Sequence, residues 1–228
     1  MLAIIAARAG SKGLKNKNIL KLNGKPLIAY SIQHALRSKF ITKVIVSTDS
    51  PKIAKIAKKY GAEVPFLRPK KLAQDNSSIN KAFEHAILFL EKKGFCYENF
   101  ISLGGSCPIR TKQDIDNAVK LYFTKKAQTL ISVKENDKPI EWYFKKTKGE
   151  RLIKFQKKQM QNRQKHEKLL IPNGSIYVFN TKKLLKNIKL NKDYSNNRTF
   201  YYLMPEERSV DIDNLNDFCF ADYLLRKK

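Results

Sequence analysis

The sequence predicts an α/β protein with a mostly parallel, mixed central sheet flanked by helices. Over residues 2–133, short apolar runs alternate with longer segments whose apolar residues recur at helical spacing, the pattern of a sheet covered on both faces. The chain has 228 residues, 42% of them hydrophobic, which is enough to bury a substantial core. We therefore expect a single domain over 1–228, with an excursion at about 136–170 where the alternation breaks down.

Turn and capping residues set the boundaries of the elements in the first half. Pro26 opens a helix, because its fixed φ suits a first helical position, and Gly61 closes the next helix at its C-terminal cap. Asp75, Asn76 or Ser77 can cap a third helix by accepting a bond from a free backbone N–H. The expected strands are 2–7, 43–47, 62–67, 100–103 and 129–133. The expected helices are 26–38, 51–60 and 112–124, together with the third helix, whose apolar face consists of Ile79, Phe83, Ala86, Ile87 and Leu90.

The second half is less regular and includes a predicted arm. Trp142–Phe144 and Arg151–Phe155, joined through Lys148 and Gly149, have the pattern of a β-hairpin or protruding arm. The expected elements after it are a strand at 175–179, a short helix at 181–187, a strand at 199–204, and a final helix that Asp213 or Asn214 caps and that runs toward Leu225.

Composition excludes several classes of protein. No stretch approaches the ~20 consecutive apolar residues of a membrane helix, and the N-terminus begins a strand at once, without the pattern of a signal peptide. The three cysteines, Cys96, Cys107 and Cys219, form no CxxC pair and predict no disulfide framework. We expect a cytoplasmic protein without a membrane partner.

A formal net charge of +26 favours a nucleic-acid or anionic partner. The lysines, however, are spread along the chain rather than gathered in a tail, as expected for solvated faces. The densest cluster, Arg151–Lys168, has few aromatic residues interleaved for stacking on bases. The pattern disfavours a nucleic-acid partner, but a basic nucleic-acid-binding protein stays an alternative.

The first strand leads directly into a loop with two glycines and four cations. Gly10 and Gly13 let the backbone come close to an anion and turn its N–H groups toward it. The spacing is neither that of a P-loop nor that of a dinucleotide fold. The residues alone therefore leave two interpretations open, a triphosphate-binding loop and a solvated lysine-rich turn. The cations that can offset phosphate charge are Arg8, Lys12, Lys15 and Lys17.

Asp211 and Asp213 form a second candidate centre. In an extended segment, residues two apart point to the same side, so both carboxylates can share one Mg²⁺. Such a metal neutralises charge on phosphate oxygens. The alternative is structural: Asp213 caps the last helix and Asp211 is solvated.

Six sequence blocks, taken together, resemble one family. The string Ala-Arg-Ala-Gly-Ser-Lys-Gly-x-x-x-Lys-Asn at 7–18 is similar to the nucleotide loop of the CMP-sialic acid synthetases, also called acylneuraminate cytidylyltransferases. The resemblance continues in order along nearly the whole chain, which makes it specific although any one block would be weak. The other blocks are Val46–Asp49, Arg68–Asp75, Pro108–Thr111, Pro172–Tyr177 and Ser209–Asp213.

The resemblance implies a nucleotide-diphospho-sugar transferase-like fold with a protruding dimerisation arm. It also implies a homodimer in which the arm reaches the partner's site. The aromatic stretches 142–144 and 200–202 offer apolar surface for that contact. The reaction expected from the family joins CTP to a nonulosonic, sialic-acid-like sugar acid, giving a CMP-sugar and pyrophosphate with Mg²⁺ as cofactor.

The resemblance also assigns roles to residues. Lys12, Lys17 and Asp211 are the expected catalytic residues, and Asp211 and Asp213 the expected metal ligands. The expected nucleotide-binding residues are Arg8, Gly10, Ser11, Lys12, Gly13, Lys17, Asn18, Arg68, Asp75 and Ser77, and the expected sugar-binding residues are Gly104, Ser106, Arg163, Asn173 and Tyr177.

One block departs from the family. Members usually read Gln-Pro-Thr-Ser-Pro-Leu-Arg after the central strand, whereas this chain has Gly-Gly-Ser-Cys-Pro-Ile-Arg at 104–110. The loss of an amide that both donates and accepts hydrogen bonds favours a nonulosonic acid other than the common sialic acid. Ile171, where an arginine is common, points the same way. Two alternatives stay open within this family and its neighbours: a cytidylyltransferase for an eight-carbon sugar acid, and a degenerate member without turnover.

Overall fold

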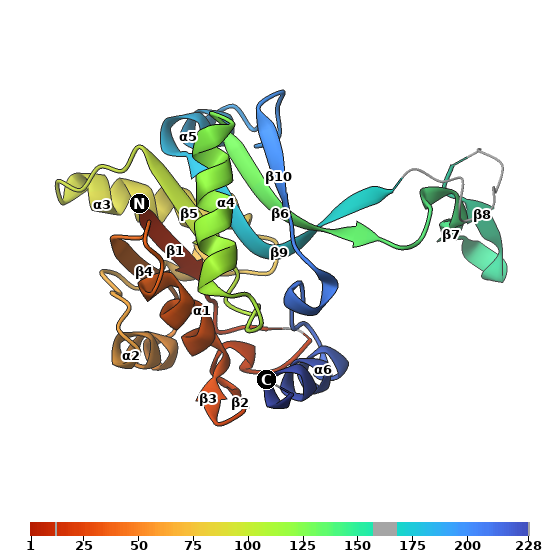
Figure 1. The fold of residues 1–228 in the computed structure, drawn as a ribbon, viewed down its shortest axis with the longest axis horizontal. Coiled ribbons are helices and arrows are strands. Elements are labelled where there is room, and N and C mark those ends of the chain that lie inside the picture. Colours follow the sequence, from red (N-terminus) through yellow and green to blue (C-terminus); the bar gives the residue numbers. More distant parts are fainter. Residues whose placement is uncertain (12, 157–167, 228) are drawn as a thin grey trace.

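The computed structural model describes residues 1–11, 13–156 and 168–227 and has a six-stranded central sheet. The strand order is β10-β6-β9-β5-β1-β4 (Figure 1). Adjacent pairs among β1, β4 and β5, and the pair β6 and β10, are parallel, while β9 runs antiparallel to both of its neighbours. The expected mixed, mostly parallel sheet is confirmed. Its strands are β1 (Leu2–Ala6), β4 (Lys43–Ser47), β5 (Asn99–Leu103), β6 (Thr129–Asn136), β9 (Leu169–Asn180) and β10 (Thr199–Leu203).

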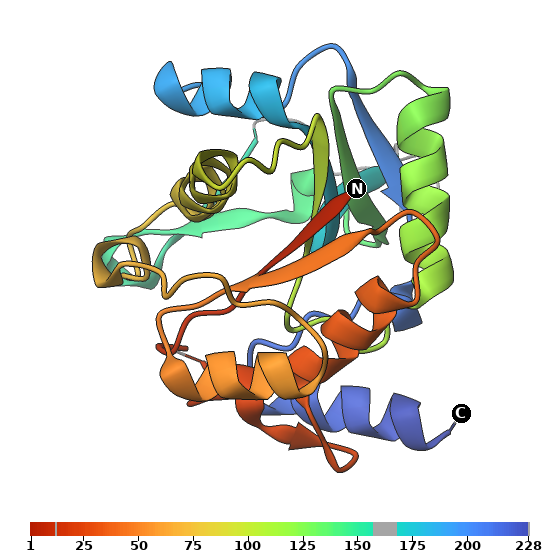
Figure 2. The ribbon, with the colours of Figure 1, turned by 90° about the vertical axis from the view of Figure 1, so that its left-hand side faces the viewer.

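Helices cover both faces of the sheet, as Figure 2 shows. On β1, Ala3 and Ile5 face one core and Leu2 and Ile4 the other, because successive side chains of a strand alternate. Helices α1, α2 and α4 pack on the first face, and α3 and α5 on the second. The helices are α1 (Leu27–Leu36), α2 (Pro51–Lys59), α3 (Ile79–Lys92), α4 (Lys112–Thr124), α5 (Thr181–Lys189) and α6 (Leu215–Arg226), with 3-10 turns at Lys17–Ile19, Lys70–Leu72, Ile140–Trp142, Lys148–Glu150 and Glu206–Arg208.

A third, smaller core joins the last helix to the first half of the chain. Ala221 of α6 and Ile212 are buried with Leu22 and Leu27, which lie at the hairpin of β2 (Lys21–Leu22) and β3 (Lys25–Pro26) and at the start of α1. This contact brings the segment before α6 back to the loop after β1. The two candidate centres of the sequence therefore meet in space.

Two local expectations are wrong. Residues 62–67 form no continuous strand: they bridge Ile45 of β4 at Glu63 and Thr48, just after β4, at Leu67, because Pro65 supplies no N–H for a ladder. The cap of α3 is Ser78, whose side chain accepts from the backbone of Asn80, rather than residue 75, 76 or 77.

The expected arm is present, and it includes more of the chain than the predicted hairpin. Strands β6 and β9 continue past the sheet as a two-stranded ribbon, pairing Asn136 with Leu169. At the far end, β7 (Phe144–Lys146) and β8 (Leu152–Lys154) pair antiparallel, and Figure 1 shows them standing away from the body. Their apolar side chains are open to solvent, with Leu152 67% exposed.

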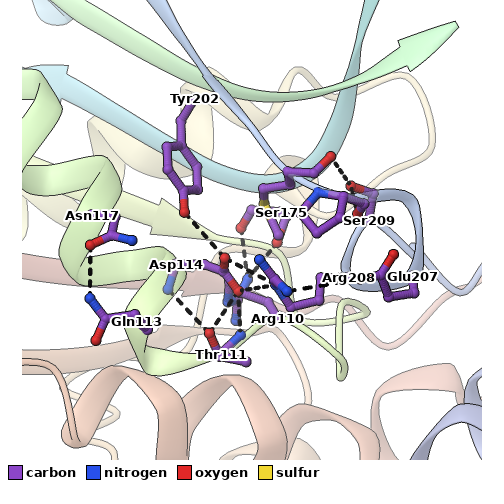
Figure 3. A network of polar contacts seen from close by, with 12 residues as sticks. Arg110, Thr111, Gln113, Asp114, Asn117, Ser175, Tyr202, Glu207, Arg208 and Ser209 are labelled. Atoms are coloured by element: carbon purple, nitrogen blue, oxygen red, sulfur yellow. Dashed lines mark hydrogen bonds and ion pairs between the residues drawn. The ribbon is translucent and has the colours of Figure 1, made fainter.

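A buried polar network fastens the chain before the second candidate centre to α4 (Figure 3). Asp114, 2% exposed, forms a capping box with Thr111 at the start of α4. The same carboxylate pairs with Arg208 at 3.1 Å and accepts a hydrogen bond from the Tyr202 hydroxyl. Because Arg208 directly precedes residues 209–213, the network fixes where that segment begins.

Candidate active site

The candidate site lies at the carboxyl edge of three parallel strands. The loops after β1, β4 and β5 share this edge, where ligands bind in open α/β sheets. Two cavities open there, of about 350 and about 320 Å³, and both are lined by Ala6, Gly105 and Ser106. The site is therefore a pair of joined compartments rather than one pocket.

The first cavity is polar and carries the basic loop. Lys17 extends its ammonium to Asp213, with Nζ 2.8 Å from Oδ1. Gly13 packs against the backbone carbonyl of Asp213 so closely that a Cβ there would overlap the oxygen. Gly10, in contrast, is exposed and has open space around it. The lining residues are Ala6, Arg8, Ser11, Gly13, Leu14, Lys17, Asn18, Gly105, Ser106 and Asp213.

Three polar side chains hold this loop in place. The backbone N–H of Ala9 donates to Asp49 Oδ1 at 2.9 Å, and Asn18 Nδ2 donates to the Arg8 carbonyl at 3.0 Å. The Arg8 guanidinium lies 2.7 Å from the Asp75 carboxylate. Asp49 is not among the site residues predicted from the sequence, although its position directly after a buried strand and within one of the family-like blocks indicated a role in the site.

Two expected nucleotide residues are placed differently. Arg68 is buried and donates from Nε to the Ser47 hydroxyl at 3.0 Å and from Nη2 to the Ser47 carbonyl. Burial lowers the pKa of Arg68, and the nearby Asp49 carboxylate counters this. The Ser77 hydroxyl donates to the Lys71 carbonyl, a local contact with a residue six positions earlier in the chain. Arg68 thus supports the end of β4 beneath the loop.

The second cavity combines backbone, polar side chains that include Ser106, and an aromatic wall. Tyr177 lines it, and burial raises the pKa of its phenol to about 12. Tyr194 contacts Tyr177 edge to face and completes the wall. Tyr194 comes from the connection between α5 and β10, which carried no sequence signal. The lining residues are Ala6, Ile79, Asn80, Phe83, Ser102, Leu103, Gly104, Gly105, Ser106, Gly174, Tyr177, Phe179, Tyr194 and Asp211.

Asp211 and Asp213 have different surroundings. Ser106 donates its hydroxyl to Asp211 Oδ1 at 2.5 Å, and the pKa of Asp211 is raised chiefly by burial. Asp213 is 75% exposed at its side chain and faces Lys17. The helix cap is Asn214, whose side chain accepts from Asp217. The carboxylate of Asp213 therefore does not serve as the cap of α6.

The two carboxylates fit a Mg²⁺ ion that is also bound by a phosphate. Asp211 lines the second cavity and Asp213 the first, so the pair lies where the compartments join. Among residues 1–11, 13–156 and 168–227, no group of three or more His, Cys, Asp or Glu side chains gathers as a cation cage. Mg²⁺ commonly uses one or two carboxylates and completes its shell with phosphate oxygens and water.

Two further buried residues support the site. Asn173 is 5% exposed; its Oδ1 accepts from Ser132 at 2.6 Å and its Nδ2 donates to Ser209 at 2.9 Å. Arg110, absent from the sequence-based set, is completely buried and donates to the Ser175 carbonyl at 2.7 Å (Figure 3). The expected residues Lys12 and Arg163 lie outside the part of the chain that the structure describes.

Comparisons with known proteins point to one family. A family model described as "Cytidylyltransferase" matches residues 2–219. The N-acylneuraminate cytidylyltransferase of Escherichia coli is 37% identical over 100% of this chain; the match covers 52% of that protein, so this chain spans about half its length. The CMP-N,N'-diacetyllegionaminic acid synthase of Campylobacter jejuni is 34% identical, with 100% of this chain and 96% of that protein covered.

A solved structure has the same fold. The CMP:2-keto-3-deoxy-manno-octonic acid synthetase complexed with CTP superposes with a TM-score of 0.70 over 99% of this chain and 98% of that one. At 18% sequence identity, the likeness is one of architecture.

The packing of Gly13 on Asp213 leads to a prediction about stability. Gly13→Ala should lower the free energy of unfolding by about 1–3 kcal/mol, because the added methyl group overlaps the Asp213 carbonyl. Gly10→Ala, in open space on the same loop, is the matched control and should stay close to wild type. Urea unfolding of the three proteins measures both values, and equal stability of the two variants would contradict the contact.

Proposed function

This chain belongs to the cytidylyltransferase family, and we propose that it transfers CMP from CTP to a nonulosonic sugar acid and releases pyrophosphate. The observation that carries the proposal is the pair of joined cavities. One is polar and lined by a basic, glycine-containing loop, and the other has an aromatic wall. Ser106 lines both cavities, and Asp211, which accepts a hydrogen bond from its hydroxyl, lines the second.

The first cavity takes the nucleotide. Arg8 and Lys17 bring positive charge to it, and the backbone between Gly10 and Gly13 can approach the phosphates closely. Lys12 belongs to the same loop and is proposed for the same task on the basis of sequence. Asn18 and Asp75 act indirectly, because they hold the Arg8 backbone and the Arg8 guanidinium.

The second cavity takes the sugar acid. Its anomeric hydroxyl attacks the α-phosphorus of CTP; a new P–O bond forms while the bond to the β-phosphate oxygen breaks and pyrophosphate leaves. The Asp211 carboxylate accepts the hydroxyl proton. No covalent enzyme intermediate is needed, because catalysis by positioning and charge neutralisation suffices for phosphoryl-type transfer.

Mg²⁺ bound by Asp211 and Asp213 would neutralise the charge that develops on the phosphates as pyrophosphate leaves. Asp213 lines the first cavity and lies beside Lys17. Asp211 is held by Ser106 at the second.

The substrate is proposed to be a nonulosonic acid other than the common sialic acid. Gly104 and Gly105 present backbone where family members usually carry a glutamine. Gly104 leaves no room for a side chain, because a Cβ would overlap the Gly174 carbonyl. Contacts with the sugar on this side therefore come from the backbone and Ser106. The aromatic wall of Tyr177 and Tyr194 suits an apolar substituent such as an acyl methyl group.

Two features bear on the setting in which the enzyme works. No helix among the described residues is long and apolar enough to cross a membrane. The three cysteines are free thiols, two of them exposed, which supports a reducing cytoplasm.

The proposed reaction predicts pyrophosphate release that needs CTP, Mg²⁺ and one nine-carbon acid together. The test is a pyrophosphate assay with sialic, legionaminic and pseudaminic acids, with an eight-carbon 3-deoxy acid as control. Release with a nine-carbon acid supports the proposal and names the substrate. Release with the eight-carbon acid alone favours the alternative function, transfer of CMP to an eight-carbon sugar acid. Absence of CTP binding, with salt-sensitive DNA or RNA binding instead, would favour the nucleic-acid alternative that the charge of +26 raises.

The role of Asp211 predicts a selective loss of turnover. Asp211→Asn keeps the shape of the side chain but removes its charge, so kcat should fall by about 10²–10³-fold. Asp222→Asn, which changes a carboxylate paired with Arg226 on α6, is the matched control and should retain activity. Steady-state kinetics and thermal unfolding of both variants make the comparison, and a fully active Asp211→Asn enzyme would remove Asp211 from the site.

The arm is proposed to form a homodimer contact. Leu152 and Ile153 are exposed on β8, and a groove of about 410 Å³ at the base of the arm is lined by Tyr143, Phe155 and Ile171, among others. Light scattering should therefore give twice the chain mass, and Leu152→Glu with Ile153→Glu should shift it toward the monomer. A monomeric wild-type protein would contradict the dimer.

A further inference from the structure

We propose that Gly174 is a positioning residue for Asp211, because the missing side chain makes the niche that the Asp211 carboxylate occupies. The proposal rests on the proposed function only in that Asp211 takes part in the reaction. According to this proposal, Asn173, Gly174 and Ser175 of β9 together set the position of the Asp211 carboxylate. The triplet does so through three different contacts.

The first contact is direct. Gly174 has φ +71°, in the left-handed region that glycine adopts readily. A Cβ at this position would lie 2.5 Å from Asp211 Oδ2 and 3.9 Å from the Asp211 Cβ. Real Cβ atoms essentially never come within 3.0 Å of another heavy atom, so any side chain at residue 174 displaces the carboxylate.

The second contact runs through Asn173. Its Oδ1 accepts from the Ser132 hydroxyl and from the Ser175 backbone N–H, and its Nδ2 donates to Ser209. Ser209 in turn donates to the Pro205 carbonyl at 2.9 Å. The amide of Asn173 thus ties β6 and β9 to the chain two residues before Asp211, and Ser132, Asn173, Ser175 and Ser209 are all buried.

The third contact runs through Ser175 and Arg110. Arg110 donates to the Ser175 carbonyl and, through Nη2, to the Ser31 hydroxyl, which donates to the Gly104 carbonyl at 2.7 Å. The loop held in this way carries Ser106, whose hydroxyl donates to Asp211. The carbonyl of Ser106 also accepts from the Ile212 N–H at 3.0 Å.

These contacts enclose Asp211 on separate sides. Gly174 borders Oδ2, Ser106 binds Oδ1, and Asn173 fixes the preceding backbone through Ser209. A carboxylate that is held in place before substrate arrives needs little reorganisation during the reaction. A glycine required only for its backbone angle would not need this proximity, and this difference can be tested.

The decisive comparison is Gly174→Ala with Gly24→Ala. Gly24 has φ +75° in the exposed β2–β3 turn, with nothing within 4 Å of an added Cβ, so it matches the backbone strain without the contact. Three measurements are made on both: the melting temperature, the position of the Asp211 carboxylate in crystal structures, and the kinetics with CTP and Mg²⁺. The Kd of CTP without metal gives a separate readout of nucleotide binding.

The expected result separates the two variants. Both should lose similar thermal stability, but only Gly174→Ala should show a displaced Asp211 carboxylate. Its kcat should fall about 10²-fold, the scale of a ~1 Å misplacement, with the KM and Kd of CTP within about threefold of wild type. An unmoved carboxylate, or a kcat equal to that of Gly24→Ala, would overturn the proposal. If wild type transfers no CMP, the proposed function fails, while the crystallographic comparison still decides the positioning role.

Ser106 provides a second route should Gly174→Ala not fold. Ser106→Ala removes the hydrogen bond to Asp211 Oδ1, and Ser106→Thr keeps a hydroxyl. We expect Ser106→Ala to lose about 10–100-fold in kcat, as for groups that orient a metal-binding carboxylate, and Ser106→Thr to recover most of it. Equal activity of Ser106→Ala and wild type would contradict the enclosure of Asp211.

Discussion

The backbone of Gly104 lies directly on the carbonyl of Gly174, and its N–H donates to the Ser175 carbonyl at 3.0 Å. Strands β5 and β9 are antiparallel neighbours in the sheet, and their backbones meet here at the end of β5 without an intervening side chain. Every part of the candidate site that involves Ser106 or Asp211 depends on this contact. A side chain at residue 104 would push the loop after β5 away from β9, and a side chain at residue 174 would displace the Asp211 carboxylate, so the second cavity would change shape in either case.

The close contact leaves Arg110 beneath the loop in an unusual environment. Its guanidinium is fully buried, and its hydrogen bonds go to carbonyl and hydroxyl groups of Ser31, Gly104 and Ser175. Burial lowers the pKa of Arg110, and the carboxylates of Asp114 and Asp211 counter this. Most of the chain's excess positive charge lies on solvated lysines, whereas Arg110, like Arg68, is part of the interior beneath the site.

The sequence was most informative where a local signal decides the outcome. Thr111 and Asp114 supply both halves of a capping box, and helix 112–124 begins and ends as expected. The basic loop of Arg8 and Lys17 follows a buried strand and lines a cavity, and this arrangement is local. Its contact with Asp213, 196 residues away, instead depends on the packing of the segment before α6 against the first half of the chain. Residues 62–67 failed as a strand because the apolar pattern outweighed Pro65 in the prediction.

Other parts of the site depend on contacts between distant segments. Asn173 was expected to face the sugar, but its amide is bonded to Ser132 and Ser209, 41 and 36 residues away. Tyr194 reaches the second cavity from an irregular connection, and Asp49 supports a loop 40 residues earlier. Neither periodicity nor capping residues encode such pairings.

The long strand β9 has a mechanical consequence of its own. The same strand runs from Leu169, which pairs with Asn136 in the ribbon, to Gly174 beside Asp211, over roughly 16 Å, so the ribbon and the candidate site share one segment of backbone and a displacement of one is expected to reach the other.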